Sequence, residues 1–275
     1  LNVAATPSNP FGSSSNVARP TASELDAISS YLLTTYNYET GPYDNYDLEG
    51  DKTKFLFRLD WNIAKGHKVN FRYSRVESSD PASMSGSFGS TGLTGLNRTA
   101  NNALWFKNSN YYQDYNFYSY AGELNSNFGS KISNTLRFSY NNQNEPRSSD
   151  SKEFPFVDIM KDGSVFTTFG YEPFSYGNFR DVKIYSLVDN LTLSAGKNNF
   201  LFGIQTDFTE TINGFQPLGA SYYRFNSFAD FQNGVKPLDF AYTYSLKKDY
   251  SQAVSRFKFQ QYSLLLQDEI TFSKQ

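Results

Sequence analysis

Residues able to carry out chemistry are sparse in this sequence. His67 is the only histidine among 275 residues, and the chain has no cysteine. These two facts exclude a histidine-based triad, a two-histidine metal site, a thiolate zinc site and a cysteine nucleophile. Gly86, Gly89, Gly92 and Gly95 could suggest a phosphate loop, but neither the following lysine nor the strand-to-helix context is present. The sequence therefore favours a protein that is not an enzyme and holds no metal or cofactor.

Carboxylates are plentiful, and a pair such as Asp60 and Glu123 could in principle do acid–base catalysis. No pocket that would perturb the pKa values of these groups can be argued from the sequence. The alternative interpretation, that these groups line a wet polar surface, is favoured.

The composition points to a β-rich protein whose apolar character is concentrated in aromatic side chains. Only 39% of residues are hydrophobic and the mean hydropathy is -0.56, yet aromatic residues reach 18%, with 26 Phe and 21 Tyr. Aromatic side chains suit strands, and they suit membrane interfaces, where one end of the ring is apolar and the other wet. The 25 basic residues balance 27 acidic ones without a long run of either sign, so we expect no nucleic-acid partner.

Apolar residues alternate strictly with polar ones in several segments. The first such segment carries Phe55, Phe57, Leu59, Trp61 and Ile63 at a period of two. One face of a strand with this pattern is apolar and the other is mostly polar. The same pattern predicts seven strands, at 53–63, 67–77, 115–127, 131–142, 182–194, 199–210 and 256–273.

Two of these strands fit the alternation poorly. Between Val182 and Leu193 both phases contain apolar residues, and Asp189 falls on the apolar phase. A β-bulge near Val188 would restore the register. In the last strand, Phe257 and Phe259 are out of phase with the residues that follow.

Short and long connections alternate along the chain. Tight turns are predicted near residues 65, 130 and 197, whereas the segments Glu77–Asp114, Asn142–Arg180 and Thr211–Ser255 are long and rich in Ser, Gly, Asn and aromatic residues. Such long connections are uncommon in compact soluble domains. Short turns on one side and long loops on the other are typical of an outer-membrane barrel. No segment approaches the roughly 20 apolar residues of a membrane helix, which a barrel does not need.

We therefore predict an all-β fold: an antiparallel transmembrane β-barrel segment of about seven strands with long extracellular loops, in contact with lipid of a bacterial outer membrane. Residues 1–50 are expected to form one more outside loop, with a short helix begun by a capping box at Thr21–Glu24. Residues 51–275 are expected to supply strands and loops of one barrel domain. Because single-chain bacterial barrels have even strand numbers, seven strands suggest an internal piece of a larger barrel.

Several strand patterns resemble those of a known family. The segments Asp51–Ile63 and Gly66–Ser74 look like a barrel hairpin of TonB-dependent transporters, closest to the Oar-like and SusC-like branch. Asp189–Leu193, Phe200–Gly203 and Leu266–Ile270 resemble further strands of that family. The resemblance implies a 22-stranded barrel that imports a bulky nutrient, with its own plug domain, TonB and in some cases a surface lipoprotein as partners.

If the chain lines a barrel, the second phase of each strand faces its lumen. The residues predicted to face the lumen are Arg58, Asp60, Arg72, Glu123, Arg137, Gln205, Asp207, Gln267 and Glu269.

Substrate recognition is expected in the long loops, because loops on a rigid scaffold often carry binding and rings offer contact area at low entropic cost. The alternative is that these rings pack loop against loop or form the interfacial girdle. The predicted substrate-binding aromatics are Trp105, Phe106, Tyr111, Tyr112, Phe169, Tyr171, Phe174, Tyr176, Tyr222 and Tyr223.

Two functions from different classes remain. The first is import of a bulky nutrient, such as an oligosaccharide or peptide, by a TonB-dependent receptor. The second is a structural or adhesive barrel whose loops bind a partner without transport. A weaker third alternative is a soluble carbohydrate-binding protein.

Overall fold

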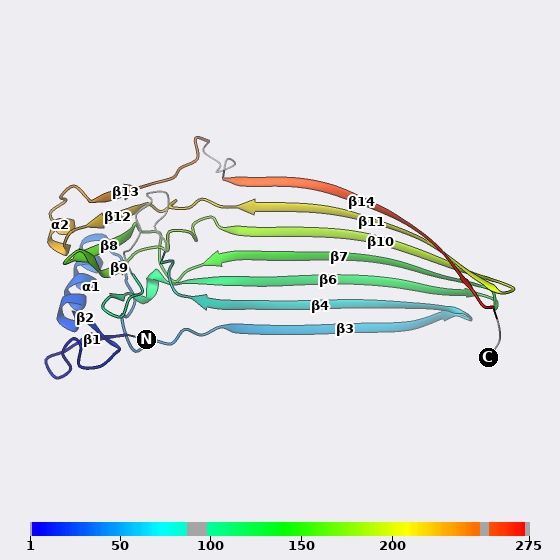
Figure 1. Cartoon of the computed structure of the whole chain (residues 1–275), viewed down its shortest axis with the longest axis horizontal. Coiled ribbons are helices and arrows are strands. Elements are labelled where there is room, and N and C mark those ends of the chain that lie inside the picture. The colour runs from blue at the N-terminus through cyan, green and yellow to red at the C-terminus, as the bar shows by residue number, and fades with distance from the viewer. Residues whose placement is uncertain (1, 87–97, 248–252, 273–275) are drawn as a thin grey trace.

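The computed structural model describes residues 2–86, 98–247 and 253–272. Its largest element is a seven-stranded antiparallel sheet in the order β14-β11-β10-β7-β6-β4-β3. These long strands run along the longest axis of the molecule (Figure 1), and in the described residues β3 and β14 form the two edges of the sheet. The bounds of the strands are β3 (Asp51–Ala64), β4 (His67–Ala82), β6 (Tyr111–Phe128), β7 (Ile132–Ser148), β10 (Phe179–Ala195), β11 (Asn198–Gly214) and β14 (Val254–Ile270).

All seven predicted strands are confirmed, and those before β14 extend beyond their predicted bounds at the long-loop end. β6, for example, begins at Tyr111 and not at residue 115. The last strand ends at Ile270, short of its predicted end, and Ser273 lies outside the described residues. The three tight turns join β3 to β4, β6 to β7 and β10 to β11, at the end of the sheet far from the long connections (Figure 1).

The period-two alternation gives the sheet two different faces. On the apolar face, large side chains remain open: Trp61 is 64% exposed, Leu264 84% and Leu266 77%. Folding of the described residues leaves this face uncovered. We call the opposite face, which carries the intervening residues, the polar face.

A row of tyrosines crosses the apolar face. Tyr73, Tyr120, Tyr140 and Tyr185 stand directly opposite one another on four adjacent strands. Their successive ring centroids lie 4.8, 6.1 and 4.8 Å apart. The row divides the apolar side chains on the short-turn side from ion pairs on the long-loop side, such as Lys183 with Asp181.

The β-bulge suggested near Val188 is wrong. β10 pairs with both β7 and β11 without a register shift. Asp189 therefore lies on the apolar face, directly opposite Leu136 and Ile204. The Asn134 side-chain amide donates a hydrogen bond of 2.5 Å to Asp189 Oδ1, which gives this carboxylate a local partner instead of a change of register.

In β14, Phe257 and Phe259 do lie on the polar face. They stand opposite Thr211 and Thr209, near the end of the strand that joins the long connection.

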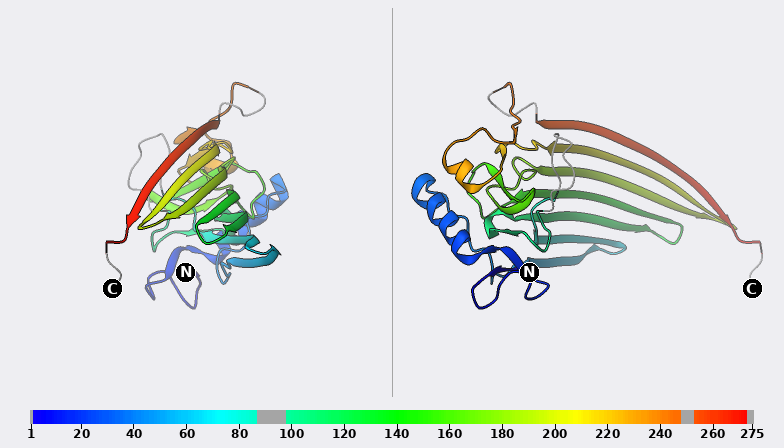
Figure 2. Two further views of the ribbon diagram at one scale, coloured as in Figure 1. Left: turned by 90° about the vertical axis from the view of Figure 1, so that its right-hand side faces the viewer. Right: turned by 60° about the vertical axis from the view of Figure 1, so that its left-hand side comes forward.

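The long segments that were predicted as loops fold together into a cap. We define the cap as the described residues of 2–50, 83–110, 149–178 and 215–253. Figure 2 shows it across one end of the twisted sheet. It contains a second sheet in the order β13-β12-β8-β9-β5 and a parallel pair, β1 with β2. Its elements are β1 (Val3–Ala5), β2 (Val17–Thr21), α1 (Ala22–Tyr36), β5 (Leu104–Trp105), the 3₁₀ turn η2 (Lys107–Ser109), β8 (Phe156–Lys161), β9 (Ser164–Phe169), β12 (Tyr222–Phe225), α2 (Phe228–Gln232) and β13 (Asp239–Ala241).

Two parallel pairings bind different segments of the cap to one another. β12 pairs with β8, and β5 pairs with β9. The β8–β9 hairpin turns at Asp162-Gly163, whose φ angles of 52° and 77° suit the tight two-residue turn that Asp-Gly favours. All four segments contribute to one apolar core: Ala4, Ala18, Leu25, Ile28, Leu32, Tyr38, Leu104, Phe106, Val157, Ile159, Phe169 and Phe225.

The predicted helix is confirmed as α1, with the expected capping box. Glu24 N donates to Thr21 Oγ1, and Thr21 N donates to the Glu24 carboxylate at 2.9 Å. Leu25, Ile28 and Leu32 share the buried face of α1. In the described residues, neither α1 nor any other helix has the length and apolar character to cross a membrane.

Candidate functional site

Four of the ten rings predicted to bind substrate lie within the core of the cap. Phe106 and Phe169 are 0% exposed, Tyr222 is 3% and Trp105 9% exposed. Trp105 Nε1 donates to Asn110 Oδ1 at 2.9 Å, so its polar edge is also satisfied. These four rings are buried and pack one segment of the cap against another.

The other six predicted rings are half-buried. The Arg147 guanidinium lies over the ring of Tyr111 at 4.6 Å, and Tyr112 donates to Asp150 at 3.0 Å. Tyr171 and Tyr176 meet edge to face at 6.3 Å. The remaining two, Phe174 and Tyr223, are also half-buried.

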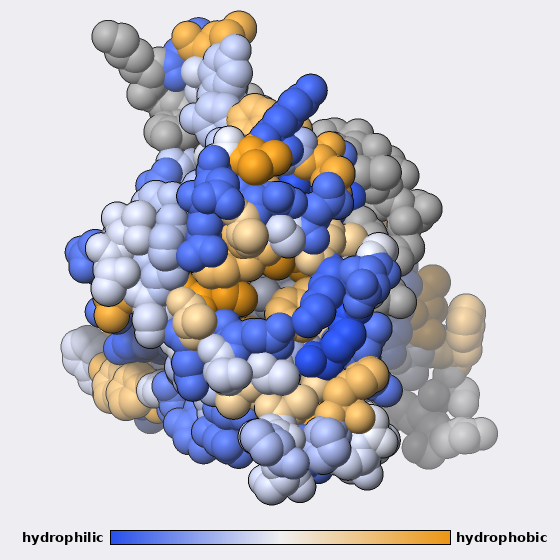
Figure 3. Space-filling view, turned by 90° about the vertical axis from the view of Figure 1, so that its left-hand side faces the viewer, coloured by the Kyte–Doolittle hydropathy of each residue, from blue (hydrophilic) through white to orange (hydrophobic). Residues whose placement is uncertain are grey.

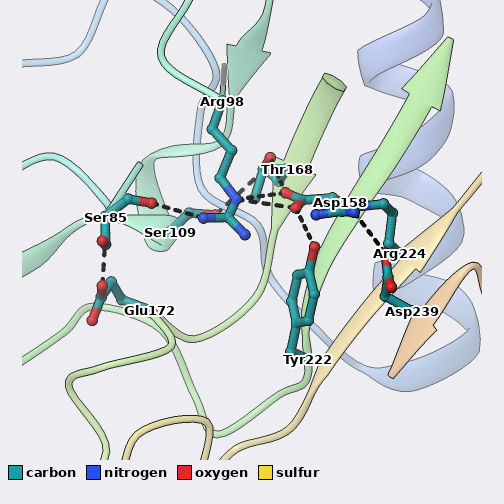
Figure 4. A network of polar contacts seen from close by, with 9 residues as sticks. All are labelled: Ser85, Arg98, Ser109, Asp158, Thr168, Glu172, Tyr222, Arg224 and Asp239. Carbon is teal, nitrogen blue, oxygen red and sulfur yellow. Dashed lines mark hydrogen bonds and ion pairs between the residues drawn. The ribbon is translucent and has the colours of Figure 1, made fainter. Parts of the chain in front are cut away.

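A buried ion pair that the sequence did not reveal joins three segments of the cap (Figure 4). Arg98 Nε donates to Asp158 Oδ1 at 2.8 Å, and Arg98 Nη1 donates to the carbonyl of Ser85 at 2.9 Å. Thr168 and Tyr222 each donate a hydroxyl to the same carboxylate, at 2.9 and 2.7 Å. The Asp158 carboxylate thus accepts hydrogen bonds from an arginine, a threonine and a tyrosine.

Burial and the neighbouring charges shift the pKa values in this network. Burial raises the pKa of the Tyr222 hydroxyl, and the Asp158 charge raises it further. Burial disfavours the charged form of Arg98, but the attraction of Asp158 outweighs it and raises the pKa of the guanidinium. Arg98 therefore stays charged and Tyr222 stays neutral, which keeps the hydrogen bonds and the ion pair to Asp158 in place.

A hollow of about 460 Å³ opens on the cap between α1, the β8–β9 hairpin and the segment from β12 to α2. This volume is in the range of small-ligand sites, which are mostly apolar with a few polar groups. Figure 3 shows the outward face of the cap, where apolar patches lie among hydrophilic side chains. We call this site the cap hollow. The residues that line it are Glu24, Ala27, Ile28, Ile159, Met160, Lys161, Asp162, Phe166, Asn226, Ser227 and Phe228.

Polar groups hold the rim of the cap hollow in place. Lys161 Nζ lies 3.0 Å from Glu24 Oε1 and 4.7 Å from the ring centroid of Phe166. Burial disfavours ionisation of Glu24, but hydrogen bonds from Thr21 and Lys161 outweigh it and lower the pKa of Glu24. The Asp162 side chain is 82% exposed. The hollow thus combines an apolar base with fixed opposite charges at its edge.

All nine residues predicted to face the lumen lie on the polar face of the sheet. The strand register places them there, since each alternates with a residue of the apolar face. Asp60 bonds Arg58 and Lys68, and Glu123 accepts from Arg137. The nine predicted residues on this face are Arg58, Asp60, Arg72, Glu123, Arg137, Gln205, Asp207, Gln267 and Glu269.

In the part of the chain that the structure describes, no three His, Asp or Glu side chains come together as metal ligands. His67 Nδ1 lies 3.0 Å from the Ser126 hydroxyl, and its ring meets Phe128 edge to face. Of the four glycines noted above, Gly86 is described, and Gly89, Gly92 and Gly95 lie outside the described residues.

These features define a class of protein. An antiparallel sheet with one open apolar face, a polar opposite face, a tyrosine row, and short turns at one end only has the pattern of a sheet from a membrane-spanning barrel. The chain belongs to the family described as the outer membrane beta barrel domain, whose model matches residues 2–275.

Among solved structures, the outer membrane transporter YddB from Escherichia coli matches with a TM-score of 0.43 and 10% sequence identity. The match covers 81% of this chain and 32% of that chain, so the sequence spans about a third of the length of YddB. No curated protein sequence matches the chain.

Membership of this family places the sheet in the bacterial outer membrane. The apolar face then meets lipid and the polar face lines the barrel interior. In such barrels the short turns are periplasmic and the long connections extracellular, so the cap lies on the outside of the cell. The tyrosine row falls where an interfacial girdle of aromatic residues is expected.

Proposed function

We propose that this chain is part of a TonB-dependent outer-membrane receptor that imports a bulky nutrient, such as an oligosaccharide or a peptide. The observation that carries the proposal is the cap hollow, an apolar cavity with a charged rim on a folded extracellular cap. A rigid exterior site above a polar-lined barrel suits capture of a solute before its passage inward.

In this proposal the ligand rests an apolar group on Ala27, which is exposed, and on Phe228, which is half-buried. Lys161 and Asp162 at the rim meet its polar groups. The half-buried rings elsewhere on the cap add contact area for the rest of a long ligand. The plug domain and TonB act through other parts of the full-length protein, and a surface lipoprotein is a further proposed partner.

The second candidate is a structural or adhesive barrel whose cap binds a partner without transport. The dense core of the cap favours it, because an adhesion surface also gains from rigidity. The two candidates differ in whether bound ligand crosses the membrane and whether crossing needs energy.

The experiment uses cells that carry the full-length protein and receive a labelled oligosaccharide mixture and a labelled peptide digest. Ala27→Trp fills the cap hollow from an exposed position of α1, and Ser30→Trp adds the same ring on the same helix away from the hollow. We expect Ala27→Trp to lower uptake at least tenfold and Ser30→Trp to leave it unchanged.

Energy dependence separates the two candidates. Collapse of the proton gradient should abolish uptake while surface binding remains. Binding with no uptake in energised cells would support the adhesive barrel, and equal effects of the two tryptophan substitutions would remove the cap hollow from either function.

A further inference from the structure

A second hollow, of about 400 Å³, lies on the polar face across β3, β4, β6 and β7. Its base is made of small side chains and its sides of longer polar ones, so the cavity follows from the sequence at alternate positions of adjacent strands. We call it the arginine hollow. The residues that line it are Arg58, Asn70, Arg72, Ser119, Ala121, Glu123, Arg137, Ser139 and Asn141.

The three arginines of this hollow differ in their partners. Arg58 donates to Asp60 through Nε at 2.7 Å and Nη2 at 3.0 Å. Arg137 donates to Glu123 through Nε at 2.7 Å. Arg72 has no acidic partner among the residues that the structure describes. One guanidinium of the hollow therefore keeps its charge uncompensated.

Arg72 is exposed in the described residues, and its neighbours on the two adjacent strands offer it no opposite charge. It stands directly opposite Arg58 in the β3–β4 register, and on its other side it stands opposite Ala121, which offers no polar atom in its side chain. Like charges directly opposite across strands are destabilising.

We propose that the arginine hollow is a carboxylate-binding site inside the barrel, with Arg72 as its central residue. A planar carboxylate accepts two parallel hydrogen bonds from a guanidinium, and an anion without this planar geometry would not form both bonds. Such a group relieves the repulsion between Arg72 and Arg58 and fills space above Ser119, Ala121 and Ser139. The proposal rests on membership of the barrel family and stands whether or not the barrel imports a nutrient.

Two sources can supply this carboxylate. One is an acidic side chain of a polypeptide that lies inside the barrel. The other is a free carboxylated solute that enters it. Both sources share the same chemistry at Arg72, and they differ in whether the hollow is open to small reagents.

The test exploits the absence of cysteine in the chain. In the full-length protein, Ser139→Cys places a thiol in the arginine hollow. Ser133→Cys places one on the same strand and face, between the uncharged Asn127 and Thr192. Each is modified with a thiol reagent that carries a sulfonate and with one that carries a trimethylammonium group. Ala121→Cys is a second reporter if Ser139→Cys does not fold.

For each cysteine we compare the rate of modification by the sulfonate reagent with the rate of modification by the trimethylammonium reagent. If the hollow takes free solutes, this ratio of rates should be on the order of tenfold higher at Ser139→Cys than at Ser133→Cys, because an unbalanced positive charge lies a few ångströms away. Added Arg72→Gln should lower that ratio several-fold. Succinate should slow the reaction at Ser139→Cys in the parent and not in the Arg72→Gln variant.

If a polypeptide carboxylate fills the hollow, both reagents should react slowly at Ser139→Cys and succinate should have no effect. Arg72→Gln should then raise both rates, whereas Lys54→Gln, which removes a charge from the same face outside the hollow, should not. The proposal would be overturned if the modification rates of Ser139→Cys and their ratio matched those of Ser133→Cys. It would also be overturned if they did not change when Arg72→Gln is added.

Discussion

Arg98 and Asp158, 60 residues apart in the chain, form an ion pair whose side chains are 1% and 0% exposed. The pair connects the segment before β5 to β8, and Tyr222 of β12 completes it. Removal of one partner from a buried pair leaves an uncompensated charge, which costs more than the pair itself contributes.

We therefore expect Asp158→Leu to destabilise the cap by about 3–5 kcal/mol. The measurement is hydrogen exchange of the β8 and β9 amides in the detergent-solubilised full-length protein. The double variant Arg98→Met with Asp158→Leu should recover most of the loss, and Asp162→Asn, whose side chain is 82% exposed, should change little. If the β8 and β9 amides were equally protected from hydrogen exchange in all three variants, the pair would not have a central role in the stability of the cap.

Gly170 allows β9 to leave the hairpin close to the preceding strand. Its φ is +107°, and a Cβ there would press on the carbonyl oxygen of Pro155 and lie 2.7 Å from Phe156 Cα. Gly170→Ala should cost more than about 3 kcal/mol, since strain and overlap add. Gly163→Ala, at φ +77° with no atom within 4 Å, should cost only about 1 kcal/mol. Limited proteolysis of the extracellular cap on intact cells should rank the two in this order.

Tyr38 makes the cap sensitive to alkali. Its ring stacks on Phe154 at 4.2 Å, its hydroxyl lies 2.8 Å from Ser151 Oγ, and burial raises its pKa from 10.0 to about 12. A raised folded pKa contributes stability that is fully present below pH 10 and is lost as the pH rises through about 12. We expect a loss of up to about 3 kcal/mol across this window.

Tyr38→Phe removes the ionising group and should flatten this pH dependence, although the hydrogen bond to Ser151 is lost at every pH. Tyr244→Phe, which changes a tyrosine that is 64% exposed, is the matched control. Exchange protection of α1 between pH 9 and 12 would reveal the difference. An unchanged profile in Tyr38→Phe would assign the alkaline loss to another group.

The polar pair of Asn134 and Asp189 on the lipid-facing side should weaken the barrel. The double variant Asn134→Leu with Asp189→Leu replaces both partners at once and leaves neither unsatisfied. We expect it to stabilise the full-length protein in lipid by up to about 2 kcal/mol, seen as a higher urea midpoint. Asp189→Leu alone should gain less, because the Asn134 amide then keeps only its longer hydrogen bond, to the Asn190 carbonyl at 3.3 Å. A lower midpoint for the double variant would mean that the pair contacts something other than lipid.

The long strands were predictable because their pattern is local. Period-two alternation places Phe57 and Arg58 on opposite faces whatever the rest of the chain does, and the same rule assigned all nine polar-face residues. Asp189 misled this reasoning because a neighbour on another strand, Asn134, satisfies its carboxylate without a bulge. Sequence spacing alone does not show that neighbour.

The cap was harder to predict because its pairings are non-local. β8 meets β12 and β9 meets β5 only after three separate segments of the cap converge. One local signal was present, the Asp162-Gly163 turn between two apolar runs, and it marks the β8–β9 hairpin. Of the aromatic residues predicted to bind substrate, Phe106 and Phe169 lie in the core of the cap. An aromatic ring in a long loop can stabilise the fold as readily as it can bind a ligand. Arg98 and Asp158 carry no local signal that they meet.

The shared core of the cap sets an order for biogenesis. Each hairpin of the sheet closes through a short turn between neighbouring strands, but the cap needs α1, the β8–β9 hairpin and β12 together. The connections that form the cap, including the one between β11 and β14, must therefore all cross the outer membrane before the cap can pack. Until then the β8–β9 hairpin lacks its neighbour β12. Its apolar side chains therefore stay accessible to chaperones and proteases while the barrel is incomplete.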